Sequence, residues 1–312
     1  MARIKFFIGG LLFFICCSVF ATEKLTLVLD WFVNPDHAPI FVAEQQGFFK
    51  AQGLDVTIIP PADPSDPPKL VAAGKADLGV TYQPQLMLDV NQGLPIIRIA
   101  TLVATPLDAI AVLKDSLINS LKDLKGKTIG YASDGVDHAM LVGMLNSAGL
   151  TLKDVTLVNV HYDLTQALLA HKVDAITGVV RNFEIPQIKL AGFTPYAFYP
   201  EEHGIPIYDE LIIVTNKKNV NDPRLKKFII ALNQGVQYLV NHPESSWQTF
   251  AKQHPELNNQ LNHDAWLATI PRFSLTPAAL DQSRYQQMAD YLVNLGQIKP
   301  MPVSQYAVSI RY

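Results

Sequence analysis

Ring-bearing and polar side chains follow the first strand that the sequence predicts, in a turn that glycine and serine could have made. Residues 29–37 read LDWFVNPDH, which supplies two aromatic rings, an amide, carboxylates and an imidazole. Aromatic rings can stack on a flat ligand, and carboxylates can accept hydrogen bonds from its ring or exocyclic N–H groups. The stretch is therefore typical of a site that binds a small planar molecule.

Three further loops carry similar residues at the ends of predicted strands. They are residues 81–85 (TYQPQ), 133–137 (SDGVD) and 181–184 (RNFE). Ligands of α/β sheets bind beyond the carboxyl ends of the strands, so we expect the four loops to meet at one cleft. The candidate ligand-binding residues are Trp31, Asn34, His37, Tyr82, Gln85, Ser133, Asn182, Glu184, Tyr208 and Asp209.

Several of these residues also have a purely structural interpretation. Trp31 could belong to a core near a sheet edge, and Tyr82 could pack within its own loop. Arg181 and Glu184 could form a surface ion pair, which contributes little to stability. Residues that could instead cap a helix are Asp36, His37 and Asp134.

The sign of the charges in the loops bears on the ligand. The positive end of a helix dipole favours anions, so a site for sulfonate, nitrate or phosphate would be expected to begin its helix with bare glycine and serine. The helix after residue 133 begins instead with Asp134 and Asp137, and Glu184 and Asp209 add further carboxylates. A neutral or weakly basic flat ligand fits this pattern better.

Motifs for catalysis, metal binding and nucleic-acid binding are missing from the sequence. There is no GxSxG elbow, no P-loop and no GxGxxG after a predicted strand, and the eight histidines form no metal-binding pair on one helical face. The net charge of −3 comes from interspersed charges without a basic stripe. We therefore expect a binding protein without metal or cofactor, and no nucleic-acid partner.

The elements that would position these loops alternate between strand and helix. Strand-like residues 24–31, 54–61 and 77–82 are separated by helix-like residues 38–47 and 65–74. The same order returns over residues 126–180, so two similar α/β units follow one another. A chain of 312 residues is long enough for two medium cores.

These units predict an α/β fold of two lobes, each a doubly wound sheet. Residues 108–115 and 208–218 are extended apolar runs, which we interpret as two strands that cross between the lobes as a hinge. The first lobe would comprise residues 22–107 and 216–312, and the second lobe residues 108–215 with the hinge strands.

The first 21 residues have the layout of a signal peptide. Arg3 and Lys5 precede a short apolar core, and cleavage is expected near Ala21. An uncleaved anchor helix is the alternative, although the apolar stretch is short for a membrane span. Both cysteines, Cys16 and Cys17, lie in this leader, so the mature chain would have neither disulfide nor thiolate chemistry. The expected location is the bacterial periplasm.

Four segments together resemble the thiamine-pyrimidine-precursor (NMT1/THI5-like) family, and within it the periplasmic formylaminopyrimidine-binding proteins. They read LDWFVNPDHAPIFVAEQQGFFKAQGLDV, GKADLGVTYQPQ, VVRNFEIPQ and YPEEHGIPIYDELIIVTNKK. The resemblance implies a two-lobed periplasmic binding protein of type II that serves an ABC importer, with a permease and an ATPase as partners. The implied ligand is an aminopyrimidine salvaged for thiamine, either formylaminopyrimidine or hydroxymethylpyrimidine.

The same family also includes a pyridoxal-phosphate-dependent synthase of the thiamine pyrimidine. That enzyme carries a lysine and a histidine in the loop after its GKxDxG motif, where this sequence has Thr81 and Gln85. Its cysteine run precedes a strand that here reads GIPIYDELIIV, without cysteine. These departures favour an importer component over the synthase. Riboflavin-type and sulfonate- or nitrate-type binding proteins are further alternatives.

Overall fold

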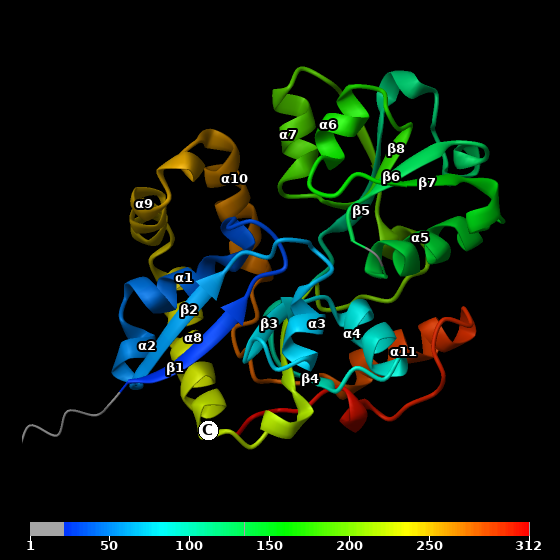
Figure 1. Cartoon of the computed structure of the whole chain (residues 1–312). Helices are drawn as coiled ribbons and strands as arrows, with labels where there is room; N and C mark the ends of the chain where they lie inside the picture. Colours follow the sequence, from blue (N-terminus) through cyan, green and yellow to red (C-terminus); the bar gives the residue numbers. More distant parts are fainter. Residues whose placement is uncertain (1–21, 134, 312) are drawn as a thin grey trace, which may run out of the picture.

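The chain folds into two lobes, each built around a five-stranded sheet (Figure 1). The computed structural model describes residues 22–311 apart from Asp134. The expected signal peptide, residues 1–21, therefore lies outside the described residues, as do Asp134 and the side chain of Asp137. Within the described part, no helix combines the length and the apolar character that a membrane span requires.

The first lobe contains a mixed sheet with the strand order β2-β1-β3-β10-β4. Its strands are β1 (Glu23–Val28), β2 (Leu54–Ile59), β3 (Leu78–Thr81), β4 (Ile96–Val103) and β10 (Leu211–Asn216). β1 runs parallel to β2 and β3, whereas β10 is antiparallel to both β3 and β4. Every residue of β3, β4 and β10 is buried, as expected for strands covered by helices on both faces.

Helices cover both faces of this sheet (Figure 1). The helices of this lobe are α1 (Ala38–Gln45), α2 (Phe48–Ala51), α3 (Pro67–Ala72), α4 (Gln83–Asn91), α8 (Pro223–Asn241), α9 (Pro243–Gln253), α10 (Gln260–Thr269) and α11 (Gln282–Asn294). Of these, α9 and α10 pack on other helices of the lobe. α8 packs closely on α1, because a Cβ at Gly235 would lie 2.5 Å from the Pro39 carbonyl oxygen. This contact fixes the helix that follows the first cleft loop.

The second lobe repeats the architecture with the strand order β7-β6-β8-β5-β9. Its strands are β5 (Asp108–Leu113), β6 (Thr128–Tyr131), β7 (Thr156–Asn159), β8 (Ala175–Val180) and β9 (Pro195–Phe198). Its helices are α5 (Val136–Ser147), α6 (Leu164–Leu169) and α7 (Glu184–Leu190). β6 is parallel to β7 and β8, and β5 is antiparallel to β8 and β9. The two α/β units predicted from the sequence thus form sheets of equivalent order.

The strands assigned to the hinge lie elsewhere than expected. β5 pairs with β8 and β9 of the second sheet, and β10 pairs with β3 and β4 of the first. The chain therefore crosses between the lobes in residues 104–107 and 199–210, and β10 moves the boundary from residue 215 to about residue 210. Both apolar runs are buried inside sheets, where their side chains leave water, instead of spanning the hinge.

A continuous apolar cluster joins the lobes on one side of the crossing segments. It includes Met87 from α4, Met144 from α5 and Leu292 from α11, all buried. The Tyr291 side chain of α11 reaches the backbone of α5, since a Cβ at Gly143 would meet its hydroxyl. The cluster is called the hinge-side cluster below.

Candidate ligand-binding cleft

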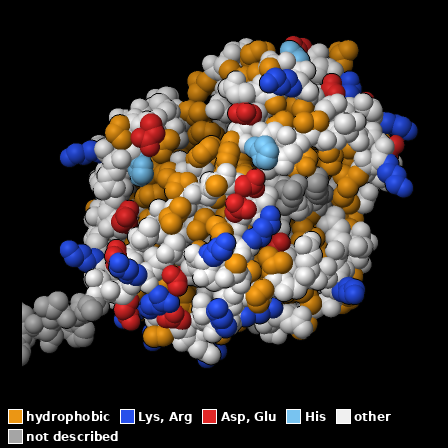
Figure 2. All heavy atoms as spheres, in the orientation of Figure 1, with side chains coloured by type: hydrophobic (Ala, Val, Ile, Leu, Met, Phe, Trp, Pro, Cys, Tyr) orange, Lys and Arg blue, Asp and Glu red, His pale blue; other side chains and the backbone are white. Residues whose placement is uncertain are grey.

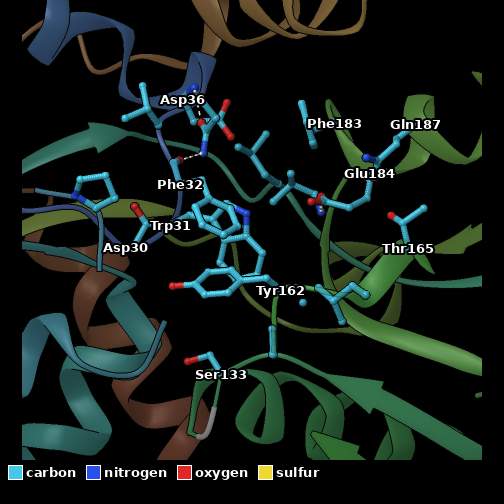
Figure 3. A pocket seen from close by; sticks show the side chains of 18 of the residues that line it. Asp30, Trp31, Phe32, Asp36, Ser133, Tyr162, Thr165, Phe183, Glu184 and Gln187 are labelled. Carbon is cyan, nitrogen blue, oxygen red and sulfur yellow. Dashed lines mark hydrogen bonds between the residues drawn. The ribbon is translucent and has the colours of Figure 1, made fainter. Parts of the chain in front are cut away.

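A cavity of about 600 Å³ lies between the lobes and is lined by residues of both. Loops after β1, β3, β6 and β8 contribute to it, as the strand-end rule predicts. Figure 2 shows hydrophobic side chains gathered where the lobes meet, and Figure 3 shows the interior. Its volume falls in the range of small-molecule sites.

Half of the candidate residues from the sequence line this cavity. From the first lobe they are Trp31, Asn34 and Tyr82, and from the second lobe Ser133 and Glu184. Asn34 also has a structural role, since its Oδ1 accepts a hydrogen bond from the Asp36 N–H at 2.8 Å and caps the 3₁₀ turn Pro35–His37. His37 occupies the N-cap position of α1, but its side chain makes no capping hydrogen bond there.

The remaining five candidates do not line the cavity. His37 is fully buried, and its Nε2 lies 2.8 Å from Asp30 Oδ1. Tyr208 is 1% exposed. Asp209 is buried and accepts hydrogen bonds from Thr101, Arg284 and Tyr285.

Gln85 and Asn182 lie at contacts between the lobes. Gln85 donates to Asp89 at 2.7 Å, and its amide lies against Gly135 of the second lobe. The Asn182 amide donates to Asp36 Oδ1 at 2.6 Å and to Thr269 Oγ1 at 2.7 Å. Because Asn182 belongs to the second lobe and its partners to the first, this interaction joins the two sides of the cleft.

Aromatic side chains form much of the cavity wall. Trp31, Phe32 and Tyr82 come from the first lobe, and Tyr162 and Phe183 from the second. Phe32 remains 51% exposed although it borders the cavity. Such rings offer flat apolar faces for a planar ligand.

Carboxylates supply the charged groups of the cavity. The lining includes Asp30, Asp36, Glu184, Glu210 and Glu256, whereas the described lining residues include no lysine, arginine or histidine. The first four are buried. A site of this composition disfavours an anionic ligand, because like charges in a low-dielectric cavity repel strongly.

Burial changes the acidity of these groups. Burial raises the pKa of Glu184 to about 7, although the Val180 N–H that donates to it at 2.8 Å acts in the opposite direction. Burial also raises the pKa values of Asp36 and Glu210, against the hydrogen bonds each accepts. Glu184 can therefore accept or donate a hydrogen bond near neutral pH.

The first-lobe wall is held by a hydrogen-bonded group around Asp30. The Tyr82 hydroxyl donates to Asp30 Oδ2 at 2.8 Å, while His37 occupies Oδ1. His37 thus positions a lining carboxylate from behind, and the loops after β1 and β3 become one unit.

Two buried polar atoms of the lining have no hydrogen-bond partner among the described residues. They are Thr165 Oγ1 on α6 and Asn262 Oδ1 on α10. Buried polar atoms are nearly always paired, so such atoms at a cavity wall indicate a polar ligand or water.

The sequence interpretation missed several lining residues. They are Asp30, Phe32, Asp36, Tyr162, Thr165, Phe183, Gln187 and Glu210. Asp30, Phe32 and Asp36 lie in the first loop that the interpretation had selected, and Phe183 lies in the selected loop 181–184. Tyr162 follows β7, so the strand-end rule could have found these five. Thr165 and Gln187 lie within helices, where no local pattern marked them.

In the described part of the chain, no three His, Cys, Asp or Glu side chains come together as a metal site would require.

The cleft and fold can be compared with known proteins. A solved alkanesulfonate-binding protein from Xanthomonas axonopodis pv. citri superposes with a TM-score of 0.72 at 17% identity, covering 91% of this chain and 97% of that chain. The fold is that of periplasmic binding proteins, which confirms the predicted two-lobed α/β class.

Relatives in sequence include both binding proteins and enzymes. A thiamine biosynthesis protein from Haemophilus influenzae is 49% identical, with 93% of each chain covered. The formylaminopyrimidine-binding protein of Halalkalibacterium halodurans is 32% identical, covering 76% of this chain and 73% of that protein. A 4-amino-5-hydroxymethyl-2-methylpyrimidine phosphate synthase from Legionella pneumophila is 28% identical, with 83% of each covered.

The family pattern described as NMT1/THI5 like matches residues 34–246, more than half of the sequence. The resemblance stated from four short segments is thereby confirmed over both lobes. This chain belongs to the NMT1/THI5-like family.

Proposed function

We propose that this chain is the periplasmic substrate-binding protein of an ABC importer and that it binds an aminopyrimidine precursor of thiamine. The observation that carries the proposal is the lining of the cleft, which combines aromatic rings with carboxylates and, among its described residues, has no cationic side chain. The relative from Halalkalibacterium halodurans, named for binding formylaminopyrimidine, supports the same ligand class.

The chemistry of an aminopyrimidine fits this lining. Its flat ring stacks on Trp31, and its exocyclic N–H groups donate to a carboxylate of the wall. Glu184, with a pKa of about 7, pairs with the amino group and an adjacent ring nitrogen, accepting at one oxygen and donating from the other when protonated. Ser133 and Thr165 offer hydroxyl groups to the substituent on the ring.

Closure of the two lobes would complete the site. First-lobe side chains take the ligand first, and second-lobe side chains reach it when the crossing segments bend. The Asn182 to Asp36 hydrogen bond accompanies that closure. The ligand then shifts the lobe equilibrium by its differential affinity, and the permease and ATPase recognise the closed form.

A synthase is the second candidate, because members of the family carry that name. Pyridoxal phosphate is bound by lysine as a Schiff base, but the described lining residues include no lysine. Thr81 and Gln85 stand at the positions of the enzyme's lysine and histidine. Thr81 is 2% exposed, and Gln85 donates a hydrogen bond to Asp89. The phosphate would also face carboxylates. Both points favour a binding protein.

Calorimetry on the chain freed of ligand by unfolding and refolding tests the proposal. We expect formylaminopyrimidine or 4-amino-5-hydroxymethyl-2-methylpyrimidine to bind with Kd in the micromolar range or tighter, about −8 kcal/mol. Taurine, nitrate, riboflavin and pyridoxal phosphate serve as comparison ligands. Tighter binding of any of these, or the absorbance of a lysine-bound pyridoxal group, would refute the proposal. Mass spectrometry of what leaves the unfolded protein then identifies the pyrimidine.

A further inference from the structure

Three aromatic rings from opposite lobes touch one another inside the cleft (Figure 3). The centroid of the Tyr162 ring lies 4.6 Å from that of Trp31, with an angle of 67° between the planes. It lies 4.1 Å from the centroid of Phe32, with an angle of 35°. Tyr162 belongs to the loop after β7 in the second lobe, and its two ring partners belong to the loop after β1 in the first.

These distances leave no space for another ring between them. Carbon atoms in contact are about 3.5–4.0 Å apart, so a ring inserted between two others separates their planes by about 7–8 Å. A planar ligand can stack on the side of Trp31 that faces Tyr162 only after the tyrosine ring has moved away. The ligand and the Tyr162 ring therefore compete for this position beside Trp31, and only one of them can occupy it.

Tyr162 is also tethered to the first lobe through its hydroxyl group. That hydroxyl donates to the Pro61 carbonyl oxygen at 3.0 Å. Burial, followed by the charges of Asp63, Asp66 and Asp30, raises the pKa of Tyr162 to about 12, so the donor keeps its proton at neutral pH. The hydroxyl is held by one neutral hydrogen bond, which is readily exchanged for water. Beside it, His161 Nδ1 lies 3.5 Å from Asp63 Oδ2, and both side chains are exposed, where such pairs contribute little.

The backbone before Tyr162 sets the direction of its ring. His161 adopts a left-handed conformation with φ of 49°, and its N–H donates to Asn159 Oδ1 at 2.8 Å. This turn directs residue 162 across the cleft. The residues on either side of Tyr162 are exposed, so the loop can move without disturbing the core.

We propose that Tyr162 gates the cleft. Its ring leaves Trp31 and Phe32 when a planar heterocycle enters, and it returns against the edge of that heterocycle, so it slows both the entry and the escape of the ligand. The gate rests on the proposed function in one respect, namely that the ligand carries a flat ring.

Stopped-flow fluorescence can follow the gate. The sequence has three tryptophans, and Trp247 and Trp266 are 6% and 0% exposed, so ligand-dependent changes in emission report Trp31. With 4-amino-5-hydroxymethyl-2-methylpyrimidine as the probe, Tyr162→Ala should raise the association rate constant about fivefold and the dissociation rate constant about tenfold. Tyr162→Phe keeps the ring and loses the hydroxyl, so its two rate constants should lie between those of Tyr162→Ala and those of the parent chain.

A matched control and a second measurement complete the test. Tyr196→Ala removes a 46% exposed tyrosine from β9 of the same lobe and should change neither rate. Acrylamide should quench Trp31 more strongly in Tyr162→Ala without any ligand. An unchanged association rate, with only faster release, would overturn the gate, because Tyr162 would then be a fixed ligand contact. If the parent chain binds neither this probe nor formylaminopyrimidine, the proposed function fails, whereas acrylamide quenching of the ligand-free chain still tests the gate.

Discussion

The lobes meet on two surfaces of opposite chemistry. In the cleft they touch through rings and hydrogen bonds, such as Asn182 with Asp36 and Tyr162 with Pro61. In the hinge-side cluster they touch through buried apolar side chains of α4, α5 and α11. Hydrogen bonds break when atoms move by about an ångström, whereas apolar contact is non-directional and tolerates sliding. The comparison indicates that cleft contacts break and re-form as the lobes move, while the hinge-side cluster holds the lobes together throughout.

The largest effect that would test this comparison is expected from Asn182→Ala. The change leaves the buried Asp36 carboxyl without its donor from the opposite lobe, while Thr269 still lies 2.8 Å away. Hydrogen bonds to charged groups contribute about 1.5–3 kcal/mol, so we expect pyrimidine affinity to fall by about 2–3 kcal/mol in calorimetry. Asn119→Ala, at an exposed asparagine of the same lobe, is the control. Normal affinity in Asn182→Ala would mean that this bond does not accompany closure.

Trp31→Ala tests the aromatic side of the cleft. Loss of a stacking face should weaken pyrimidine binding by about 1–3 kcal/mol, while Trp31→Phe should retain most of the affinity. Calorimetry with either pyrimidine measures the change. If the free energies of unfolding and of binding fall by the same amount, Trp31 mainly supports the second-lobe core, against which it also packs.

Glu184→Gln tests the acidity of the cleft. The folded-state pKa of about 7 lies above the ordinary value of 4.5, so the folded chain binds more protons between these values and loses stability as pH rises through this window. Lowering the pH from 7.5 to 5 should therefore raise the free energy of unfolding less in Glu184→Gln than in the parent chain, and we expect a difference of roughly 1–2 kcal/mol. Thermal unfolding at both pH values measures it. Identical pH profiles would contradict the assignment, and Glu202→Gln provides the comparison on the surface.

The smallest effect is expected at the hinge-side cluster. Gly143→Ala brings a methyl group against the Tyr291 hydroxyl and, at 3.1 Å, against Ile205. The tyrosine end can shift, so we expect a stability loss of about 1 kcal/mol, at the low end for overpacking, with pyrimidine affinity almost unchanged. Thermal unfolding measures the loss of stability, and calorimetry on the same sample measures the pyrimidine affinity. A larger loss in affinity than in stability would contradict the division of roles.

The sequence was sufficient for the lobes but not for the placement of every strand. The alternation of strand-like and helix-like segments predicts two α/β units, and both exist. β5 and β10 are buried along their whole length and are mostly apolar, so their sequences do not reveal which sheet receives them. That choice depends on pairing with strands far away in the chain.

The candidate site shows the same limit at the level of side chains. A turn rich in rings and acids indicates where a cleft lies, and Trp31 and Glu184 do line it. The direction of a side chain depends on remote partners. Asp209 turns away because Arg284, 75 residues later, pairs with it at 2.7 Å. Tyr162 lies at a strand end, where the strand-end rule could have found it, but no composition rule marks the left-handed His161 that precedes it.

The position of β10 has a consequence for how the chain acquires its structure. The second sheet has all five strands by residue 198, whereas the first sheet lacks an inner strand until residues 211–216 are available, and α8 follows later still. Non-local pairing carries a loop-closure cost that delays it. We therefore expect the second sheet, which the middle of the sequence forms, to fold before the first sheet. Pulse-labelled hydrogen exchange during refolding should find β5–β9 protected ahead of β1 and β3, and simultaneous protection would count against this order.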